Sequence, residues 1–171
     1  MLQKPPTSEY SSFFQRYMDK IPDGDLLKLL RTNLDATVSL VKDLPESKLA
    51  FRYAEGKWSI KEVLIHHADG ERIFSYRALC IARGDQTPLP GFDENEYAPQ
   101  SFADLRSIGS ILQEMKSIRE STIELFSNFD PSVWTRMGTV SNAPISVRAI
   151  AYIIAGHELH HQSVIREKYL S

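Results

Sequence analysis

In four long stretches of this chain, apolar residues recur at three- and four-residue spacing, and no stretch alternates apolar and polar residues as a surface strand does. This spacing puts the apolar side chains of each stretch on one face of an α-helix. We predict helices over residues 25–44, 59–84, 101–130 and 146–171. Such helices bury their apolar faces most simply against one another, so the sequence predicts an all-α fold, an up-and-down four-helix bundle.

Local signals mark the ends of the predicted helices. Residues 59–62, Ser-Ile-Lys-Glu, form a capping box in which the serine and glutamate side chains each satisfy a free backbone N–H group. Residues 101–104, Ser-Phe-Ala-Asp, form a weaker box at the expected start of the third helix. Pro45 and Pro131 are expected to end the first and third helices, because proline cannot continue a helix.

The predicted connections at residues 45–58, 84–100 and 130–145 are long for a simple bundle, and links above about 12 residues often form lids or binding loops. The first and third lead into the second and fourth helices, and we expect both to line the mouth of a site. No repeat or composition break divides the chain. We therefore expect one domain, residues 1–171, with residues 1–23 as an N-terminal extension packed on the bundle.

Charge and cysteine content narrow the class of protein. The chain has 20 Lys and Arg against 22 Asp and Glu, without a basic stripe that could neutralise phosphates, so we expect no nucleic-acid partner. No stretch approaches the roughly 20 apolar residues of a membrane span, and the first residues do not form a signal peptide. Cys80 is the single cysteine, which excludes an internal disulfide. We expect a cytoplasmic protein without a membrane partner.

The five histidines occupy only two places, His66 and His67 on the second helix and His157, His160 and His161 on the fourth. His157 and His161 are four residues apart, so their imidazoles lie on one helix face within reach of a common ion. The pair alone is a weak sign of a metal, because two hydrogen-bonded histidines on a helix are a common structural feature. The second cluster strengthens it.

In an up-down-up-down bundle the second and fourth helices run parallel, and His66 lies about seven residues into one while His157 lies about eleven into the other. At about 1.5 Å per residue the two differ by only a few ångströms along the bundle. One ion could then contact three histidines and keep a position open for water or substrate. Periodicity does not choose between His66 and His67. His160 is one residue away from the apolar face of the fourth predicted helix, and we expect it at the surface or beside the site.

Residues 157–161 also match the H-E-x-x-H pattern of zinc peptidases. Only ten residues follow His161, too few for the downstream glutamate-bearing helix of those enzymes. The extended version of the motif fails as well, because Val164 and Glu167 stand where glycine and histidine are needed. We therefore reject the peptidase family and expect the third ligand to come from upstream.

Three further residues could take part in chemistry. Glu158 could act as a general base on a water at the metal, or lie exposed on its helix as most helical glutamates do. Asp69, one turn beyond His66, could orient a ligand imidazole or be a surface charge. Arg77 could bind an anionic substrate, but a salt bridge to an acid on a neighbouring helix is the favoured interpretation.

Four blocks of the sequence, at residues 56–66, 71–79, 89–93 and 155–161, resemble those of DinB/YfiT-like proteins. The likeness extends over about residues 26–170. It implies a four-helix bundle, a nickel or zinc site completed by water, and frequently a homodimer. In that family the first metal histidine stands eight residues after a tryptophan, which here selects His66 over His67. The other two ligands correspond to His157 and His161.

Members of the family are described as metal-dependent hydrolases, or as S-transferases and isomerases that use a low-molecular-weight thiol such as bacillithiol or mycothiol. The resemblance thus implies a metal-dependent enzyme for a small-molecule substrate, either a hydrolase or a thiol S-transferase. In such an enzyme Glu158 and Asp69 are our catalytic candidates, each as a general base. The alternative is a stress-response module that binds a metal or small molecule without turnover. The DNA-damage origin of the family name concerns induction and does not imply DNA binding.

Overall fold

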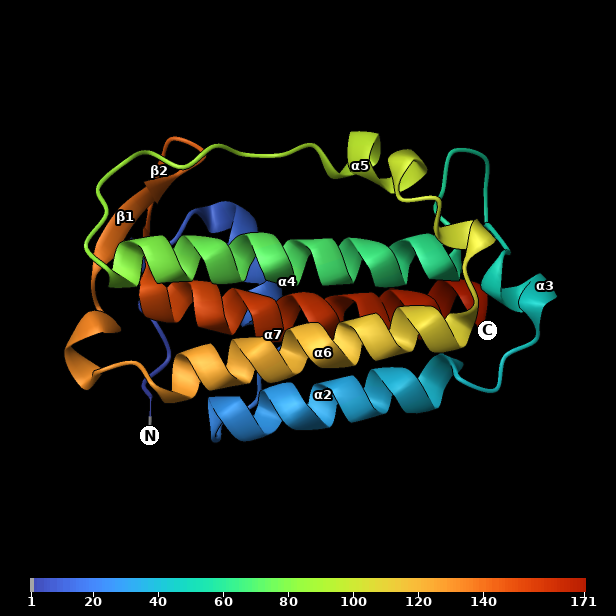
Figure 1. Ribbon diagram of the computed structural model, residues 1–171, viewed down its shortest axis with the longest axis horizontal. Coiled ribbons are helices and arrows are strands. Elements are labelled where there is room, and N and C mark those ends of the chain that lie inside the picture. Colours follow the sequence, from blue (N-terminus) through green and yellow to red (C-terminus); the bar gives the residue numbers. More distant parts are fainter. Residues whose placement is uncertain (1) are drawn as a thin grey trace.

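The computed structural model describes residues 2–171, and four long helices form a bundle (Figure 1). These helices are α2 (Leu26–Val41), α4 (Ile60–Ala82), α6 (Ile108–Ser127) and α7 (Val147–Val164). A π-helical turn, Ile165–Tyr169, continues α7. The predicted all-α four-helix bundle with long connections is confirmed. Among residues 2–171, no helix is both long enough and apolar enough to cross a membrane.

Short elements occupy the connections and the N-terminal extension. They are α1 (Gln15–Met18), α3 (Glu46–Leu49), α5 (Glu94–Gln100), the 3₁₀ turns Thr7–Glu9, Ser12–Phe14, Ala103–Leu105 and Pro131–Val133, and the strands β1 (Met137–Val140) and β2 (Ala143–Ser146). The two strands pair antiparallel as a hairpin. Both turn residues, Ser141 and Asn142, have left-handed backbones, with φ of 50° and 63°, as in the tight turns that suit hairpins. Strands of four residues are too short for an alternating pattern to reveal.

The third long helix runs in a direction that simple alternation did not predict. Glu71 pairs with Arg119 at 2.7 Å, and one turn later the hydroxyls of Ser75 and Thr122 are 3.1 Å apart. Residue numbers therefore rise together along α4 and α6, so these two helices are parallel. A crossover, residues 83–107, connects the end of α4 to the start of α6, and Figure 1 shows it running back along the outside of the bundle.

The third long helix also starts later than the sequence predicted. Ser107, and not Ser101, caps α6, accepting a hydrogen bond from the Ser110 amide at 3.2 Å. The crossover is therefore longer than the expected connection of residues 84–100. At about 3.3 Å per extended residue it easily covers the roughly 35 Å length of α4.

The helices α4 and α7 are antiparallel, which corrects the expectation that they run parallel. The Tyr169 hydroxyl donates to the Trp58 carbonyl at 2.6 Å, and eight residues after Trp58 the ring of His66 meets that of His157. Residue numbers therefore fall along α7 as they rise along α4. Consequently the segments that lead into α4 and α7 lie at opposite ends of the bundle. Residues 45–58 and 130–145 therefore cannot line one mouth together, and the prediction that they do is wrong.

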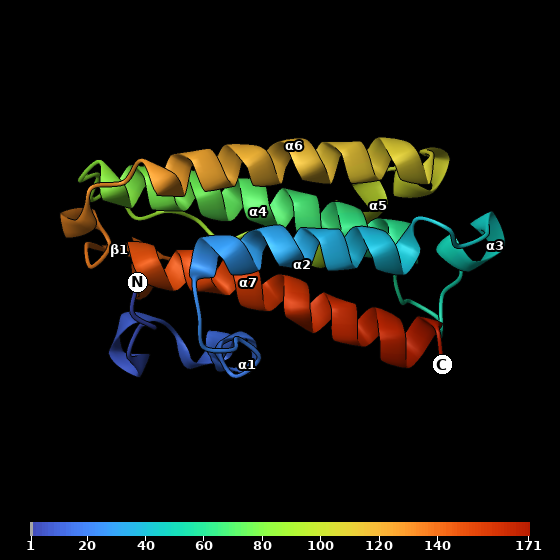
Figure 2. The same cartoon turned by 90° about the horizontal axis from the view of Figure 1, so that it is seen from below.

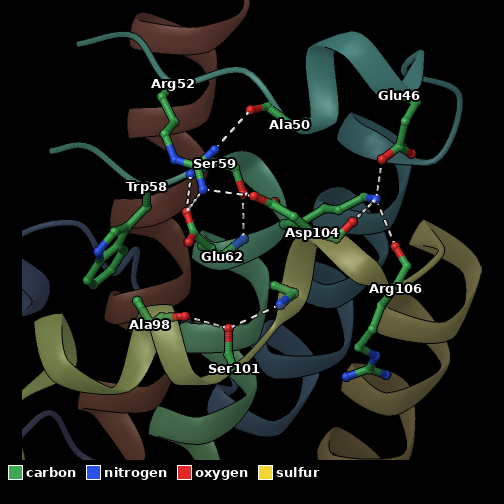
Figure 3. A network of polar contacts seen from close by, with 12 residues as sticks. Glu46, Ala50, Arg52, Trp58, Ser59, Glu62, Ala98, Ser101, Asp104 and Arg106 are labelled. Atoms are coloured by element: carbon green, nitrogen blue, oxygen red, sulfur yellow. Dashed lines mark hydrogen bonds and ion pairs between the residues drawn. The ribbon is translucent and has the colours of Figure 1, made fainter. Parts of the chain in front are cut away.

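A polar network fixes the start of α4 (Figure 3). The predicted capping box is present: the Ser59 hydroxyl accepts from the Glu62 amide at 3.1 Å, and the Glu62 carboxylate accepts from the Ser59 amide at 2.7 Å. Asp104 accepts from the Ser59 hydroxyl at 2.6 Å, and Arg52 donates to both Glu62 and Asp104. These contacts join the connection before α4 to the crossover and so set the orientation of the helix that carries His66.

The N-terminal extension packs on α7, and Figure 2 shows α1 on the α7 side of the bundle. The contact is close because Gly156 has no side chain. A Cβ atom at Gly156 would lie 2.4 Å from the carbonyl oxygen of Tyr17, well inside van der Waals contact. Tyr17 and Met18 are buried, so this contact seals one side of the bundle.

We expect Gly156→Ala to lower the free energy of unfolding by about 1–3 kcal/mol, because its methyl group overpacks backbone atoms that cannot rotate away. Urea unfolding measures the change. Gly109→Ala is the matched control: Gly109 also lies in a long helix, and nothing stands within 4 Å of its added Cβ. The control should gain stability, up to about 1 kcal/mol, from alanine's higher helix propensity. Equal changes in the two variants would show that the α1–α7 contact is loose.

Candidate metal centre

Three imidazoles from two helices converge at one point. The Nε2 of His157 lies 3.0 Å from the Nε2 of His66 and 2.9 Å from the Nε2 of His161. One ligand atom from each of the three residues can be chosen so that all lie within 4.8 Å of one another. Two nitrogens bound to one ion at about 2.1 Å are themselves roughly 3 Å apart. The cluster therefore has the spacing of a three-histidine metal site.

Antiparallel packing explains why the histidines meet. His66 is the seventh residue of α4, and His157 lies seven residues before the last residue of α7. Because the start of α4 lies beside the end of α7, these positions reach the same level of the bundle. A Cβ atom at Gly70 would touch the His157 ring at 3.4 Å, so the small residue at this position makes room for that imidazole.

Burial keeps these histidines neutral. Desolvation lowers the pKa of His66 to about 4, with a smaller contribution from His160. Desolvation is also the main reason that the pKa values of His157 and His161 lie well below the usual range, and the neighbouring imidazoles lower them further. A neutral imidazole keeps a lone pair on one nitrogen, which is the form that binds metals. Three neutral imidazoles with facing nitrogens fit a divalent transition metal.

Aromatic rings hold the histidines in place. The Trp58 ring centroid lies 4.8 Å from that of His66. On the other side of the cluster, the rings of Tyr17 and Phe74 contact His157 edge to face, with centroids 5.3 and 6.5 Å away. These contacts come from three separate parts of the chain, so the cluster depends on the complete fold.

The other two histidines lie outside the group of converging nitrogens. His67 is buried and stacks on His157, with ring centroids 5.1 Å apart and planes 9° apart, and neither of its nitrogens has a hydrogen-bond partner among the described residues. His160 is partly exposed and packs on Tyr17. The structure thus brings His66, and not His67, to His157 and His161.

Glu158 does not face the converging nitrogens and is not exposed. Its side chain is 1% exposed, accepts a hydrogen bond from the Thr37 hydroxyl at 2.7 Å and pairs with Arg119 at 2.8 Å. The reason is that the residue after His157 faces the core of the bundle, where it meets Thr37 of α2 and Arg119 of α6. Desolvation raises the pKa of Glu158, although Arg119 and Thr37 oppose this. Its contacts are those of a buried ion pair and give no support to the expected role as a base.

Asp69 also lies apart from the histidine cluster. Its carboxylate is 3.6 Å from Arg72, and it lines a separate surface hollow with Glu96 and Tyr97 of α5. Desolvation raises its pKa, and Arg72 opposes that effect. Among the described residues no hydrogen bond joins Asp69 to a histidine ring, so the geometry does not support its expected role in orienting a ligand.

A pocket of about 290 Å³ opens on the cluster, with His66 and His157 in its wall. Three parts of the chain outside the long helices complete it: the N-terminal extension, the crossover near Phe92 and the β1–β2 hairpin. The crossover is attached to the hairpin through Leu89, whose amide donates to the Thr139 carbonyl at 2.9 Å. All but the last residue of the hairpin lies within the expected connection 130–145, whereas the other two parts of the wall were not expected.

Arg77 lies in the same pocket wall, where its side chain is buried. Its Nη2 donates to the Pro90 carbonyl at 2.6 Å. The expected salt bridge to an acid on a neighbouring helix is absent from the described residues. The acids of α6 and α7 that face the core are already paired with Arg119, Arg72 or Arg106, which leaves none for Arg77.

Comparison with known proteins gives consistent matches over nearly the whole chain. The family model described as the DinB superfamily matches residues 29–165. A protein from Oceanobacillus iheyensis, whose name provisionally classes it as a metal-dependent hydrolase, is 27% identical over 142 residues, which cover 82% of this chain and 81% of the relative. Among solved structures, YfiT from Bacillus subtilis superposes with a TM-score of 0.75 at 16% identity, covering 96% of this chain and 90% of YfiT. YfiT is described as a probable metal-dependent hydrolase with an unusual four-helix bundle topology.

Proposed function

We infer, since the chain belongs to the DinB superfamily, that His66, His157 and His161 hold one divalent transition metal and that the protein is a metal-dependent hydrolase. The convergence of three neutral imidazoles beside a pocket carries this proposal. The names of the Oceanobacillus iheyensis relative and of YfiT support the hydrolase class. Zinc and nickel are the proposed ions, because both favour imidazole nitrogen.

A three-histidine ligand set leaves coordination positions free for water and substrate. A divalent ion in such a site acts as a Lewis acid and lowers the pKa of a coordinated water. The protein supplies the surroundings. His66 and His157 form part of the pocket wall, so a molecule in the pocket lies against the metal ligands, and the apolar rings of Phe14, Tyr17 and Phe74 limit access of bulk water.

Metal-loaded protein screened against carboxylic esters, amides and phosphoesters tests the hydrolase proposal. We expect hydrolysis that disappears with chelator and returns with zinc or nickel. His66→Ala should lower kcat/KM by at least about 100-fold, since the ion is lost or misplaced. His160→Ala is the control, because the His160 ring lies 5.1 Å from that of His161 but outside the group of converging nitrogens. This variant should retain activity.

A second arm of the screen supplies electrophiles together with small thiols, including bacillithiol and mycothiol. Conjugation in this arm without hydrolysis in the first would replace the hydrolase proposal with a thiol S-transferase that uses the same three ligands. Metal binding without turnover in either arm would favour a binding module. Protein that takes up no zinc or nickel would contradict the metal site itself.

A further inference from the structure

Arg77 is a buried cation without an anionic partner. The residue is 5% exposed, and the one hydrogen bond that its side chain makes to a described residue is that to the Pro90 carbonyl. Arg119, the other deeply buried arginine, lies between two carboxylates. A buried charge without a partner is unfavourable, because it loses hydration and gains no compensating attraction. Desolvation accordingly lowers the pKa of Arg77, whereas that of Arg119 is raised by its two acids.

The surroundings of Arg77 explain how such a cation is held. Its guanidinium lies over the rings of Phe74 and Phe92, 5.4 and 5.8 Å from their centroids. The aromatic faces stabilise the cation without neutralising it. One guanidinium nitrogen is fixed by Pro90, and the remaining N–H groups have no partner among the described residues. The side chain is thus oriented and keeps donors for a molecule in the pocket.

The same pocket joins Arg77 to the histidine cluster. His66, Gly70, Phe74 and Arg77 follow one stripe of α4 at helical spacing, and all four line the pocket. His157 lies at the level of Gly70, so about seven residues, or roughly 10 Å of helix rise, separate it from Arg77. Side chains of a helix lean toward its N-terminus, which brings the guanidinium back toward the histidines. The aromatic body of a bound molecule could therefore reach from the Arg77 guanidinium to His66 and His157.

We propose that Arg77 binds the anionic group of the substrate, and that the substrate is an anion with an apolar, aromatic-sized body whose reacting group lies at His66 and His157. The substrate part of this proposal rests on the proposed function. The anion-binding part does not, because it needs only the pocket and Arg77. Phe13, Phe14, Tyr17, Phe74 and Phe92 supply the apolar walls for the body. A planar guanidinium with free donors suits a carboxylate, which can accept two parallel hydrogen bonds.

Glu94 is the one acid in the wall of this pocket. No ion pair joins it to Arg77 within 4.0 Å. Its negative charge opposes an incoming anion, so its removal provides a test of sign. Glu94→Gln should leave anion affinity unchanged or raise it. A fall in anion affinity in this variant would contradict the proposal, because it would mean that Arg77 depends on Glu94.

Binding is measured first on chelator-treated protein, so that no metal ion can attract the anion. The probes are naphthoate and naphthamide, which share an aromatic body and differ in charge, and calorimetry gives both affinities. We expect naphthoate to bind more tightly than naphthamide, and Arg77→Met to weaken naphthoate by roughly 10- to 100-fold while leaving naphthamide within about twofold, as expected for loss of hydrogen bonds to a charged group. Equal binding of the two probes to the wild-type protein would overturn the proposal.

Two further variants guard against a folding artefact. Arg136→Met is the matched control, since Arg136 also donates a guanidinium N–H to a backbone carbonyl, that of Ala82 at 2.6 Å, but does not line the pocket. It should bind naphthoate as the wild type does. Arg77→Lys keeps the charge without the planar fork, and its naphthoate affinity should fall between those of the wild type and Arg77→Met. An affinity equal to that of Arg77→Met would show that charge at this position does not bind the anion.

Turnover then separates the two proposals. Metal-loaded protein is offered para-acetoxybenzoate and its neutral amide analogue, para-acetoxybenzamide. We expect kcat/KM to favour the anionic ester and Arg77→Met to abolish that preference through KM. If neither these esters nor the amides and phosphoesters of the wider screen are hydrolysed but naphthoate binding still depends on Arg77, the hydrolase proposal fails and the anion site stands. Hydrolysis of both esters at equal rates would overturn the assignment of the substrate class alone.

Discussion

Arg119→Met is expected to lower the free energy of unfolding by about 3–5 kcal/mol. Arg119 is 2% exposed and pairs with Glu71 and Glu158, whose side chains are 5% and 1% exposed. It also donates to the backbone carbonyl of Leu30. The substitution would leave two carboxylates in the core with no cation between them, and a buried unpaired charge costs far more than an exposed one. Chemical denaturation followed by circular dichroism measures the loss.

The comparison variants separate the loss of a charge partner from the loss of a long side chain. Arg83 is exposed and forms no ion pair within the described residues, so Arg83→Met should change stability by no more than about 0.5 kcal/mol. Adding Glu71→Gln and Glu158→Gln to Arg119→Met removes the charges that the first substitution isolates, and should recover most of the lost stability. A loss below about 1 kcal/mol for Arg119→Met would show that water reaches Glu71 and Glu158 and solvates their charges.

Zinc or nickel is expected to raise the melting temperature of chelator-treated protein by roughly 10 °C. An ion that binds only the folded chain stabilises it by about 4 kcal/mol when its concentration is a thousandfold above Kd. For a chain of this size each kcal/mol corresponds to about 2–4 °C. Thermal unfolding at increasing metal concentration measures the shift. His66→Ala and His157→Ala should show little or none of it.

Calcium is the control ion for this experiment, because it is a hard cation that prefers oxygen ligands and should not bind three imidazoles. A comparable shift with calcium would indicate a site built from carboxylates elsewhere on the surface. A full shift with zinc in the His157→Ala variant would likewise place the ion away from the histidine cluster.

The long helices could be predicted from the sequence, but their directions could not. Periodicity reports which residues share a face, and the capping box at Ser59 and Glu62 formed as expected. The direction of α6 depends on the length and course of the crossover, and neither is encoded in a helical period. The weak box at Ser101 was misleading, because that serine ends α5 and its hydroxyl accepts a hydrogen bond from the Ala103 amide at 3.3 Å.

The meeting of the histidines was expected for a reason that does not hold. Parallel helices with similar offsets from their starts would have brought His66 near His157. The helices are antiparallel, and the two residues meet because one lies near the start of α4 and the other at a similar distance from the end of α7. The clustering of histidines at helical spacing was the informative signal, and it was independent of helix direction.

The pocket was largely invisible in the sequence because its wall comes from distant segments. Phe14 and Tyr17 belong to an extension that shows no motif, and Phe92 belongs to a connection without periodicity. The aromatic content of the extension was the one available sign that it packs on something. The burial of Glu158 was missed because a polar residue on an otherwise apolar helix is usually exposed, and its partner Arg119 lies on a different helix.

Crystals of zinc- or nickel-loaded protein, measured at the absorption edge of the ion, show where the metal binds. We expect one anomalous difference peak per chain, within about 2.1 Å of the Nε2 atoms of His66, His157 and His161. This expectation would be contradicted by a peak bound to other residues, or by no peak at all in protein whose histidine rings stand as described above.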